Sequence, residues 1–418
     1  MNVMQQEDID KALAQEQQLP ATAVLAASMA CCKAGARHAD VTLAQHVAAL
    51  SENSDPLVPL PVVSLLNGGT KGAGGDFVQD ILLVPDEATS INEALVMTCQ
   101  VATAFKELLI KQAITNMNFG RTGGLCPSVS SCSFETAMDC AVAAIDAAGY
   151  KNRVHICLDL HTSKLFQRRT AEGSEELTSA YALNKYLEGD EEEDEPTLTS
   201  KEELTEKYIG WVRKYPIISL IEPYGPVDAE TQADLLSQLE PVMEGKRQLQ
   251  AEEAAAAAAP AAEGDAEEAD KAAGEAEEGE PVATGLGGDA SCFFEIVGDS
   301  QIESFDDISQ AIDQRSCNAL LLTLKRSPTI TDTINLCKRA QASGWGVILS
   351  EDDDDGIAGG SAEFLAGLGG GLRVGQIKVG GWGSPETCAM MNELARGAKA
   401  GSNEEGRQFA GSKFRACA

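Results

Sequence analysis

The chain has 418 residues, of which 44% are hydrophobic, and this is enough for a packed core in one large domain or two ordinary ones. Its formal net charge of −33 argues against nucleic acid and anionic membranes as partners, because both would repel it. The sequence has no run of about 18 apolar residues and does not begin with a basic segment followed by an apolar one. We therefore expect a soluble, cytoplasmic protein.

The cysteines of this chain do not form a recognisable disulfide or metal pattern. All twelve are scattered along the sequence, many in apolar stretches, without the paired CxxC spacing of a zinc site. We expect reduced, buried thiols.

From residue 60 onward, short apolar runs alternate with amphipathic stretches. The apolar runs have the composition of strands buried on both faces, and they are Val62–Leu66, Ile81–Val84, Val154–Leu160, Ile217–Ile221, Phe293–Gly298, Ala319–Leu324, Gly346–Leu349 and Val374–Val379. The predicted helices are Ile91–Lys111, Phe134–Ala148, Lys201–Lys214, Ala229–Met243, Ile308–Gln314, Thr331–Ala342 and Pro385–Arg396. Eight strands with six βα units after an irregular start predict an α/β fold, a modified (β/α)₈ barrel.

An acidic segment interrupts this pattern at residues 246–290. Its main part, Gln250–Asp289, consists largely of Ala, Glu, Gly and Pro, with twelve acidic residues against the single base Lys271. Such a composition cannot bury enough apolar surface to offset the entropy of ordering, so we predict a disordered insertion. Two interpretations stay open: a solvated loop, or an acidic segment that binds protein partners. A shorter acidic run, Glu188–Glu195, is expected to be a surface loop.

Five motifs in collinear order resemble the enolase (phosphopyruvate hydratase) family. They are Pro61–Gly69, which ends in Asn-Gly-Gly; Val297-Gly298-Asp299; Gln341–Val347, which contains Gly-Trp-Gly; Gly375-Gln376-Ile377-Lys378; and Phe409–Arg415. The resemblance implies an enolase-type barrel over residues 59–415. It also implies that residues 1–58 are a truncated, helical remnant of the family's N-terminal α+β domain. The family's dimer leads us to expect homodimers, or heterodimers with enolase-type subunits.

The same resemblance indicates three metal-ligand positions. Enolase-type sites hold Mg²⁺ with carboxylates at the ends of successive strands, where oxygen donors converge. Asp159 matches the first ligand and Asp299 the third. The second is ambiguous, since the alignment places Ile221 at the ligand position and Glu222 one residue beyond. A one-residue shift turns a side chain to the opposite face, so Glu222 serves only if the strand end is locally irregular. Two interpretations stay open: a site that binds Mg²⁺ weakly, or carboxylates that remain from the family pattern without a metal.

The residues that transfer protons in enolases are mostly replaced in this chain. Thr323 takes the position of the catalytic lysine base, and Thr122 takes that of the general-acid glutamate. A second glutamate of the site is shortened to Asp80, and a histidine is replaced by Lys71, so that Lys378 alone keeps its identity. A threonine hydroxyl cannot remove a proton from a weak carbon acid near neutral pH.

The loop that binds substrate phosphate in enolases is also inverted in charge. Where the family carries Ser-His-Arg-Ser, this chain has Ser350-Glu351-Asp352-Asp353-Asp354-Asp355, whose carboxylates repel a phosphate. Lys325, two residues beyond Thr323, is a candidate displaced base on a regular strand, but a shift of about 6.6 Å would carry it past a substrate fixed by metal ions.

Two functions therefore compete. The first is a non-catalytic scaffold or binding module, since divergent enolase-like proteins of flagellated and sperm cells also have eroded sites; this analogy suggests cytoskeletal, flagellar or glycolytic assemblies. The second is an active Mg²⁺-dependent lyase that converts 2-phosphoglycerate to phosphoenolpyruvate in glycolysis, or that acts on another carboxylate. Asp159, Asp299 and Lys378 favour the second, whereas Thr323, Thr122, Glu351 and Asp352 favour the first.

Overall fold

The computed structural model describes residues 2–16, 18–72, 78–115, 117–127, 132–170, 177–183, 198–258, 294–350, 361–399 and 407–416. Within these residues eight strands form a closed barrel, because the last strand pairs with the first. The barrel strands are β1 (Leu60–Asn67), β2 (Asp80–Val84), β5 (His155–Asp159), β9 (Ile217–Ile221), β10 (Glu295–Gly298), β11 (Ala319–Thr323), β12 (Gly346–Ser350) and β13 (Gln376–Val379). The predicted barrel is therefore confirmed.

The irregular start of the barrel comes from the direction of β2. This strand pairs antiparallel with both β1 and β5, whereas the remaining neighbours in the barrel pair in parallel. The first residue of β2, Asp80, therefore lies beside the last residue of β5, Asp159. Both carboxylates reach the end of the barrel where the parallel strands finish, which is called the mouth below.

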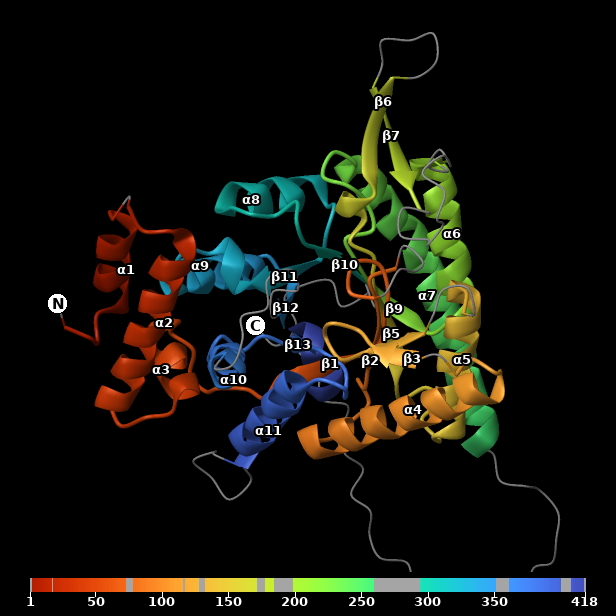
Figure 1. The fold of residues 1–418 in the computed structure, drawn as a ribbon, viewed down its shortest axis with the longest axis horizontal. Helices are drawn as coiled ribbons and strands as arrows, with labels where there is room; N and C mark the ends of the chain where they lie inside the picture. The colour runs from red at the N-terminus through yellow and green to blue at the C-terminus, as the bar shows by residue number, and fades with distance from the viewer. Residues whose placement is uncertain are drawn as a thin grey trace, which may run out of the picture.

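Helices surround the barrel (Figure 1). They are α4 (Ile91–Lys111), α5 (Phe134–Ala147), α6 (Lys201–Lys214), α7 (Ala229–Ala258), α8 (Phe305–Gln314), α9 (Ile330–Ala342), α10 (Ser361–Gly371) and α11 (Pro385–Lys399). Five begin after a capping hydroxyl, from Ser90, Ser133, Ser200, Ser304 and Thr329, which accepts a hydrogen bond from a first-turn backbone N–H. The sequence analysis missed α10, because its four glycines are poor helix formers.

Helix α7 extends farther than the sequence pattern predicts. It continues to Ala258, and so into the acidic segment that was expected to begin at residue 246. Residues 259–293 lie outside the described residues, as do residues 184–197 with the shorter acidic run.

Several short elements were not predicted. Strands β3 (Met117–Phe119) and β4 (Leu125–Pro127) form a small hairpin beside β1. Strands β6 (Phe166–Thr170), β7 (Leu177–Ala182) and β8 (Leu198–Ser200) form a separate antiparallel sheet, of which β6 and β7 project from the molecule (Figure 1). Short 3₁₀ turns cover Thr162–Lys164, Leu324–Arg326 and Gly411–Ala416. Such three-to-six-residue elements give no periodicity to detect.

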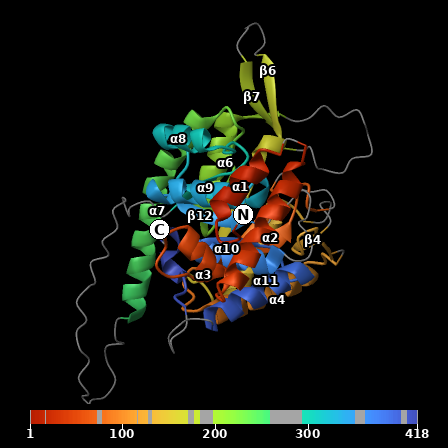
Figure 2. The ribbon, with the colours of Figure 1, turned by 90° about the vertical axis from the view of Figure 1, so that its left-hand side faces the viewer.

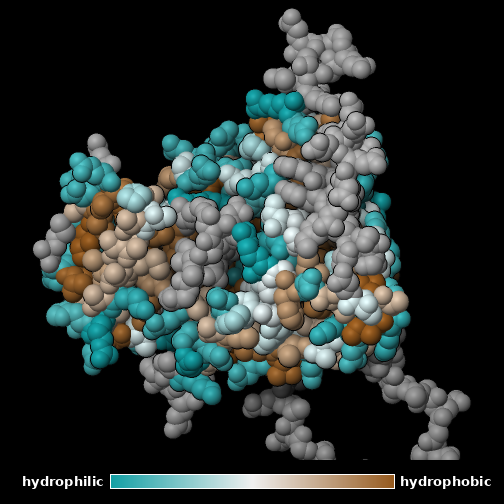
Figure 3. All heavy atoms as spheres, in the orientation of Figure 1, coloured by the Kyte–Doolittle hydropathy of each residue, from teal (hydrophilic) through white to brown (hydrophobic). Residues whose placement is uncertain are grey.

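The N-terminal segment contains three helices, α1 (Gln6–Ala14), α2 (Ala21–His38) and α3 (Leu43–Leu50), which lie at one side of the barrel (Figures 1 and 2). Hydrophobic residues gather on their outer surface (Figure 3). Asp10 anchors α1 to α9, because its Oδ2 accepts hydrogen bonds from the backbone N–H and the hydroxyl of Thr331, at 3.0 and 2.6 Å. Its Oδ1 accepts a hydrogen bond from the hydroxyl of Ser28 at 2.6 Å, so α2 is joined to the same carboxylate. The negative charge of Asp10 is favourable there, because it lies at the N-terminus of α9.

The C-terminal segment closes the end of the barrel opposite the mouth. Phe414 packs so closely on Gly375 that a Cβ there would lie 1.5 Å from the Phe414 carbonyl oxygen, which explains why a glycine directly precedes β13. Arg415 Nε lies 3.5 Å from the buried Glu295, which also accepts a hydrogen bond from Gln376 at 2.9 Å.

In the described part of the chain every cysteine is a free thiol, and none of the helices is both long and apolar enough to cross a membrane.

Candidate active site at the barrel mouth

A buried cluster of two lysines and two aspartates occupies one side of the mouth. Lys378 Nζ, at the end of β13, lies 2.5 Å from Asp159 Oδ2 and 3.5 Å from Asp80 Oδ2. Lys71, in the turn after β1, pairs with Asp80 and lies 3.5 Å from Asp159 Oδ2. None of these four side chains is more than 4% exposed. The two positive and two negative charges balance within the cluster, which is named the Lys–Asp cluster below.

Asn67 connects this cluster to the β3–β4 region. Its amide Nδ2 donates hydrogen bonds to Asp80 and, at 2.9 Å, to Ser64 Oγ. Its Oδ1 accepts from the hydroxyl of Thr122 at 3.0 Å and from the backbone N–H of Gly124 at 2.9 Å. Thr122, which the resemblance places at the general-acid position, is therefore held as a hydrogen-bond donor to an amide oxygen.

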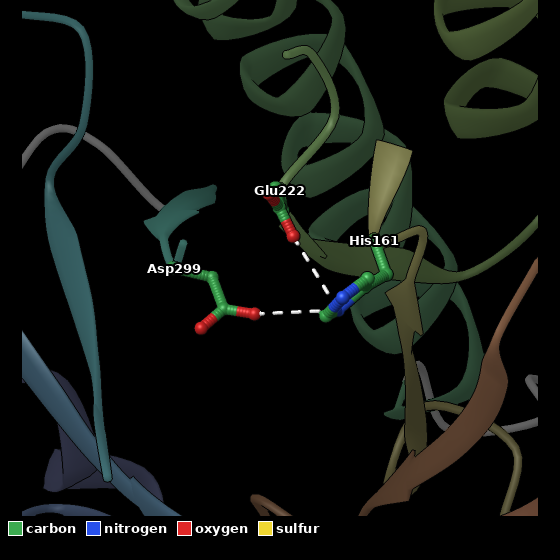
Figure 4. A group of neighbouring side chains, drawn as sticks. All are labelled: His161, Glu222 and Asp299. Atoms are coloured by element: carbon green, nitrogen blue, oxygen red, sulfur yellow. Dashed lines mark ion pairs between the residues drawn. The ribbon is translucent and has the colours of Figure 1, made fainter. Parts of the chain in front are cut away.

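A second group, His161, Glu222 and Asp299, lies at the ends of β5, β9 and β10 (Figure 4). His161 Nδ1 is 3.4 Å from Glu222 Oε2 and 3.6 Å from Asp299 Oδ2. One donor atom from each residue lies within 4.8 Å of the other two. Burial raises the pKa of Glu222 to about 8, and the charge of the neighbouring Asp299 acts in the same direction.

The end of β9 has the local irregularity that the sequence analysis required for Glu222 to reach the mouth. Strand β9 ends at Ile221, which pairs with Asp159 in register and is fully buried. The backbone of Glu222 then takes a positive φ of 50°, a conformation that is uncommon for a residue with a side chain. Through this irregularity Glu222 leaves the alternation of the strand and joins Asp299 at the mouth. His161 also has a positive φ, of 45°.

Arg326 and Ser300 complete the second group. The Arg326 guanidinium pairs with Asp299, and the Ser300 hydroxyl donates a hydrogen bond to Glu222 Oε1. Arg326 comes from the 3₁₀ turn Leu324–Arg326, which directly follows β11. A displaced base at Lys325 would require a regular strand beyond Thr323, and this condition is not met, because β11 ends at Thr323, one residue before the predicted end at Leu324.

Thr323, which the resemblance places at the base position, is the last residue of β11 and lies at the mouth. It is 6% exposed and pairs in register with Ser350 at the end of β12. Glu351 and Asp352, the substituted phosphate-loop positions, lie outside the described residues. The structure thus brings Lys71, Asp80, Asp159 and Lys378 together, and separately Glu222 and Asp299.

The sequence analysis missed His161 and Arg326. The position of His161, two residues after Asp159, was an available signal, since residues after a barrel strand line the mouth. For Arg326 there was no such signal, because its place depends on where β11 ends.

Two of the three predicted metal ligands form a donor set that fits a divalent cation. Glu222 and Asp299 offer carboxylate oxygens, which suit Mg²⁺, and His161 offers an imidazole nitrogen. Asp159 is not part of this set, because Lys378 and Lys71 pair with it. Asp299 also has a cationic partner, but Arg326 pairs with its Oδ1, whereas its Oδ2 faces His161 Nδ1. The residues therefore fit a cation site with fewer carboxylates than the resemblance implied.

Comparisons with known proteins agree with this architecture. A family model described as "Enolase, C-terminal TIM barrel domain" matches residues 55–250 and 287–418. The chain is also similar to an enolase of Solanum lycopersicum, with 28% identity over 385 residues, which cover 91% of this chain and 71% of that enolase.

Proposed function

The chain belongs to the enolase family, and we propose that it is a non-catalytic member that acts as a scaffold or binding module in the cytoplasm. The Lys–Asp cluster carries this proposal. Lys378 is the lysine that the family motif retains, and its ammonium is engaged by Asp159 at 2.5 Å and by Asp80 at 3.5 Å. Such a lysine serves as a counter-ion within the protein rather than as a group directed at a substrate.

The other proton-transfer positions support the same conclusion. Removal of a proton beside a carboxylate requires a base, and Thr323 offers a hydroxyl instead. The leaving hydroxide requires an acid, and Thr122 offers a hydroxyl that already donates to Asn67. The sequence Glu351–Asp355 further opposes a phosphorylated anion by its charge. Base, acid and phosphate donors are thus replaced together.

A second candidate function is an active, metal-dependent lyase acting on 2-phosphoglycerate or on another carboxylate. The grouping of His161, Glu222 and Asp299 favours it, because this donor set suits a divalent cation. In such an enzyme Glu222 and Asp299 would hold the Mg²⁺, whose charge would stabilise an ene-diolate. Lys378 would then have to leave Asp159 to reach a substrate.

Weak binding of Mg²⁺ is compatible with either function, and we expect the metal to raise the melting temperature. At a millimolar concentration and a Kd of about 0.1 mM, the free energy of unfolding rises by roughly 1.4 kcal/mol, a shift of a few degrees. The double variant Glu222→Gln, Asp299→Asn should abolish the shift in differential scanning fluorimetry. A metal response that survives in this variant would place the cation elsewhere.

For a scaffold, the acidic segment from residue 246 is the feature through which we propose contact with basic surfaces of partner proteins, in cytoskeletal, flagellar or glycolytic assemblies. Pairing with a second enolase-type subunit is the other association that we propose.

The loss of the base is tested by exchange of the C2 proton of 2-phosphoglycerate with solvent. This exchange requires proton abstraction but not dehydration, so it reports the base alone. The purified protein, in D₂O with excess Mg²⁺, should leave the C2 proton signal unchanged in NMR spectra over hours, while an active enolase in a parallel sample removes it. Exchange faster than in the buffer control would favour the second candidate.

A further inference from the structure

A cavity that none of the mouth residues lines lies between the N-terminal helices and the outer helices of the barrel. It has a volume of about 600 Å³. Its lining comes from α2, α3, α10 and α11, from the segment before β1 and from the segment after α11. In Figure 2 these helices, α2, α3, α10 and α11, lie next to one another on the side that faces the viewer. A volume of this size is in the usual range of small-molecule sites, about 300–1,000 Å³.

The charges around this cavity are opposite in sign to those of the whole chain. Four basic residues line it, Lys33, Arg37, Arg396 and Arg407, against two acidic ones, Glu363 and Glu393. The cavity therefore carries an excess of two positive charges in a protein whose net charge is −33. An excess of this kind attracts anions into a concave site.

The two acidic residues do not neutralise all four cations. Glu363 pairs with Lys33 at 2.8 Å, and Glu393 pairs with Arg396 within one turn of α11. Among the described residues, neither Arg37 nor Arg407 has a carboxylate partner. These two guanidinium groups are the ones available to an anion.

Arg407 is the more constrained of the two. Its guanidinium donates a hydrogen bond to Thr42 Oγ1 at 2.9 Å, and its backbone N–H donates to the carbonyl of Ala398 at 3.0 Å. Burial lowers the pKa of the Arg407 side chain, because the charged form loses hydration there. A half-buried guanidinium held in place in this way can form a hydrogen-bonded ion pair with a carboxylate, sulfonate or phosphate.

The remaining wall of the cavity is apolar. Val41, Leu43, Leu57, Pro59 and Leu394 contribute hydrocarbon surface, and Ala36, Ala44 and Gly367 leave room because their side chains are small. A ligand that fits this lining has an anionic group and an apolar body.

We propose that this cavity is a binding site for a small organic anion with an apolar body, whose charged group is held by Arg407 and Arg37. The site is separate from the barrel mouth and does not depend on whether the mouth is catalytic.

The probe for this site is 8-anilinonaphthalene-1-sulfonate, which joins an aromatic body to one sulfonate and becomes fluorescent in apolar surroundings. Titration of the full-length protein should give saturable binding to one site. The neutral analogue N-phenyl-1-naphthylamine should bind at least about tenfold more weakly, since it lacks the group that the arginines hold. Equal affinity for both compounds, or no saturable binding, would overturn the proposal.

Two variants locate the binding. Arg407→Gln and Arg37→Gln should each weaken binding of the sulfonate by about tenfold or more, with little effect on the neutral analogue. Arg213→Gln, an exposed arginine on α6 that does not line the cavity, is the matched control and should bind as the wild type does. Arg37 is exposed, so its variant carries the test if Arg407→Gln does not fold. Affinities that are the same in all three variants would contradict the assignment.

Discussion

Replacing Lys378 by methionine is expected to lower the free energy of unfolding by about 3–5 kcal/mol, although this lysine is the one that the family motif retains. Among the described residues, the variant leaves Asp80 and Asp159, which are both about 1% exposed, with Lys71 as their remaining lysine partner. A buried carboxylate without its counter-ion costs several kcal/mol, which is more than the lost ion pair contributed.

The double variant Lys378→Met, Asp159→Asn separates this effect from a general loss of packing. It removes one positive and one negative charge, so the cluster is neutral again. We therefore expect the double variant to lose less free energy of unfolding than the two single variants lose together, by more than about 1 kcal/mol. Urea unfolding followed by circular dichroism is measured for the wild type, the single variants Lys378→Met and Asp159→Asn, and the double variant. The control pair is Lys338→Met with Glu52→Gln, an ion pair of 2.6 Å at the surface, where little change is expected. A single Lys378→Met variant as stable as the wild type would contradict the structural role.

Restoring a lysine at position 323 is expected to restore no turnover. Thr323→Lys supplies a base at the end of β11, but the acid position remains Thr122 and the phosphate loop keeps its carboxylates. Interactions that stabilise a transition state jointly are not recovered one at a time. Phosphoenolpyruvate formation by the variant should therefore equal that of the wild type.

The melting temperature of Thr323→Lys must be measured beside its activity, because residue 323 is buried and a new ammonium there can destabilise the barrel. Turnover of about 1 s⁻¹ or more in a folded variant, in the ordinary range of enzymes, would show that the base alone was missing.

The barrel could be predicted from the sequence because its strands are apolar runs between amphipathic helices. Helices Ile91–Lys111 and Lys201–Lys214 begin and end where the pattern predicted them. A capping serine precedes each helix and determines where it begins. Helix α10 was missed because its glycines give no helical signal, although it packs fully buried residues such as Phe364 and Leu368 against the barrel. Tertiary packing, rather than propensity, determines that helix.

The candidate site was predictable in its residue types but not in its pairings. The sequence placed Lys71, Asp80, Asp159 and Lys378 near the mouth, yet whether the lysines point at a substrate or at the aspartates depends on side-chain geometry. Glu222 was ambiguous for a local reason, because one residue of positive φ decides where its carboxylate goes. Arg326 reaches Asp299 only because β11 ends at Thr323 in a 3₁₀ turn.

The central claim is that this enolase-family barrel does not dehydrate 2-phosphoglycerate, and its most direct test is the steady-state rate of phosphoenolpyruvate formation. The full-length wild-type protein is assayed with excess Mg²⁺ in a coupled reaction, with an active enolase as the positive control. We predict a rate equal to that of the buffer control, because base, acid and phosphate donors are replaced together and Lys378 is paired with Asp159. Turnover above about 1 s⁻¹ would contradict the account.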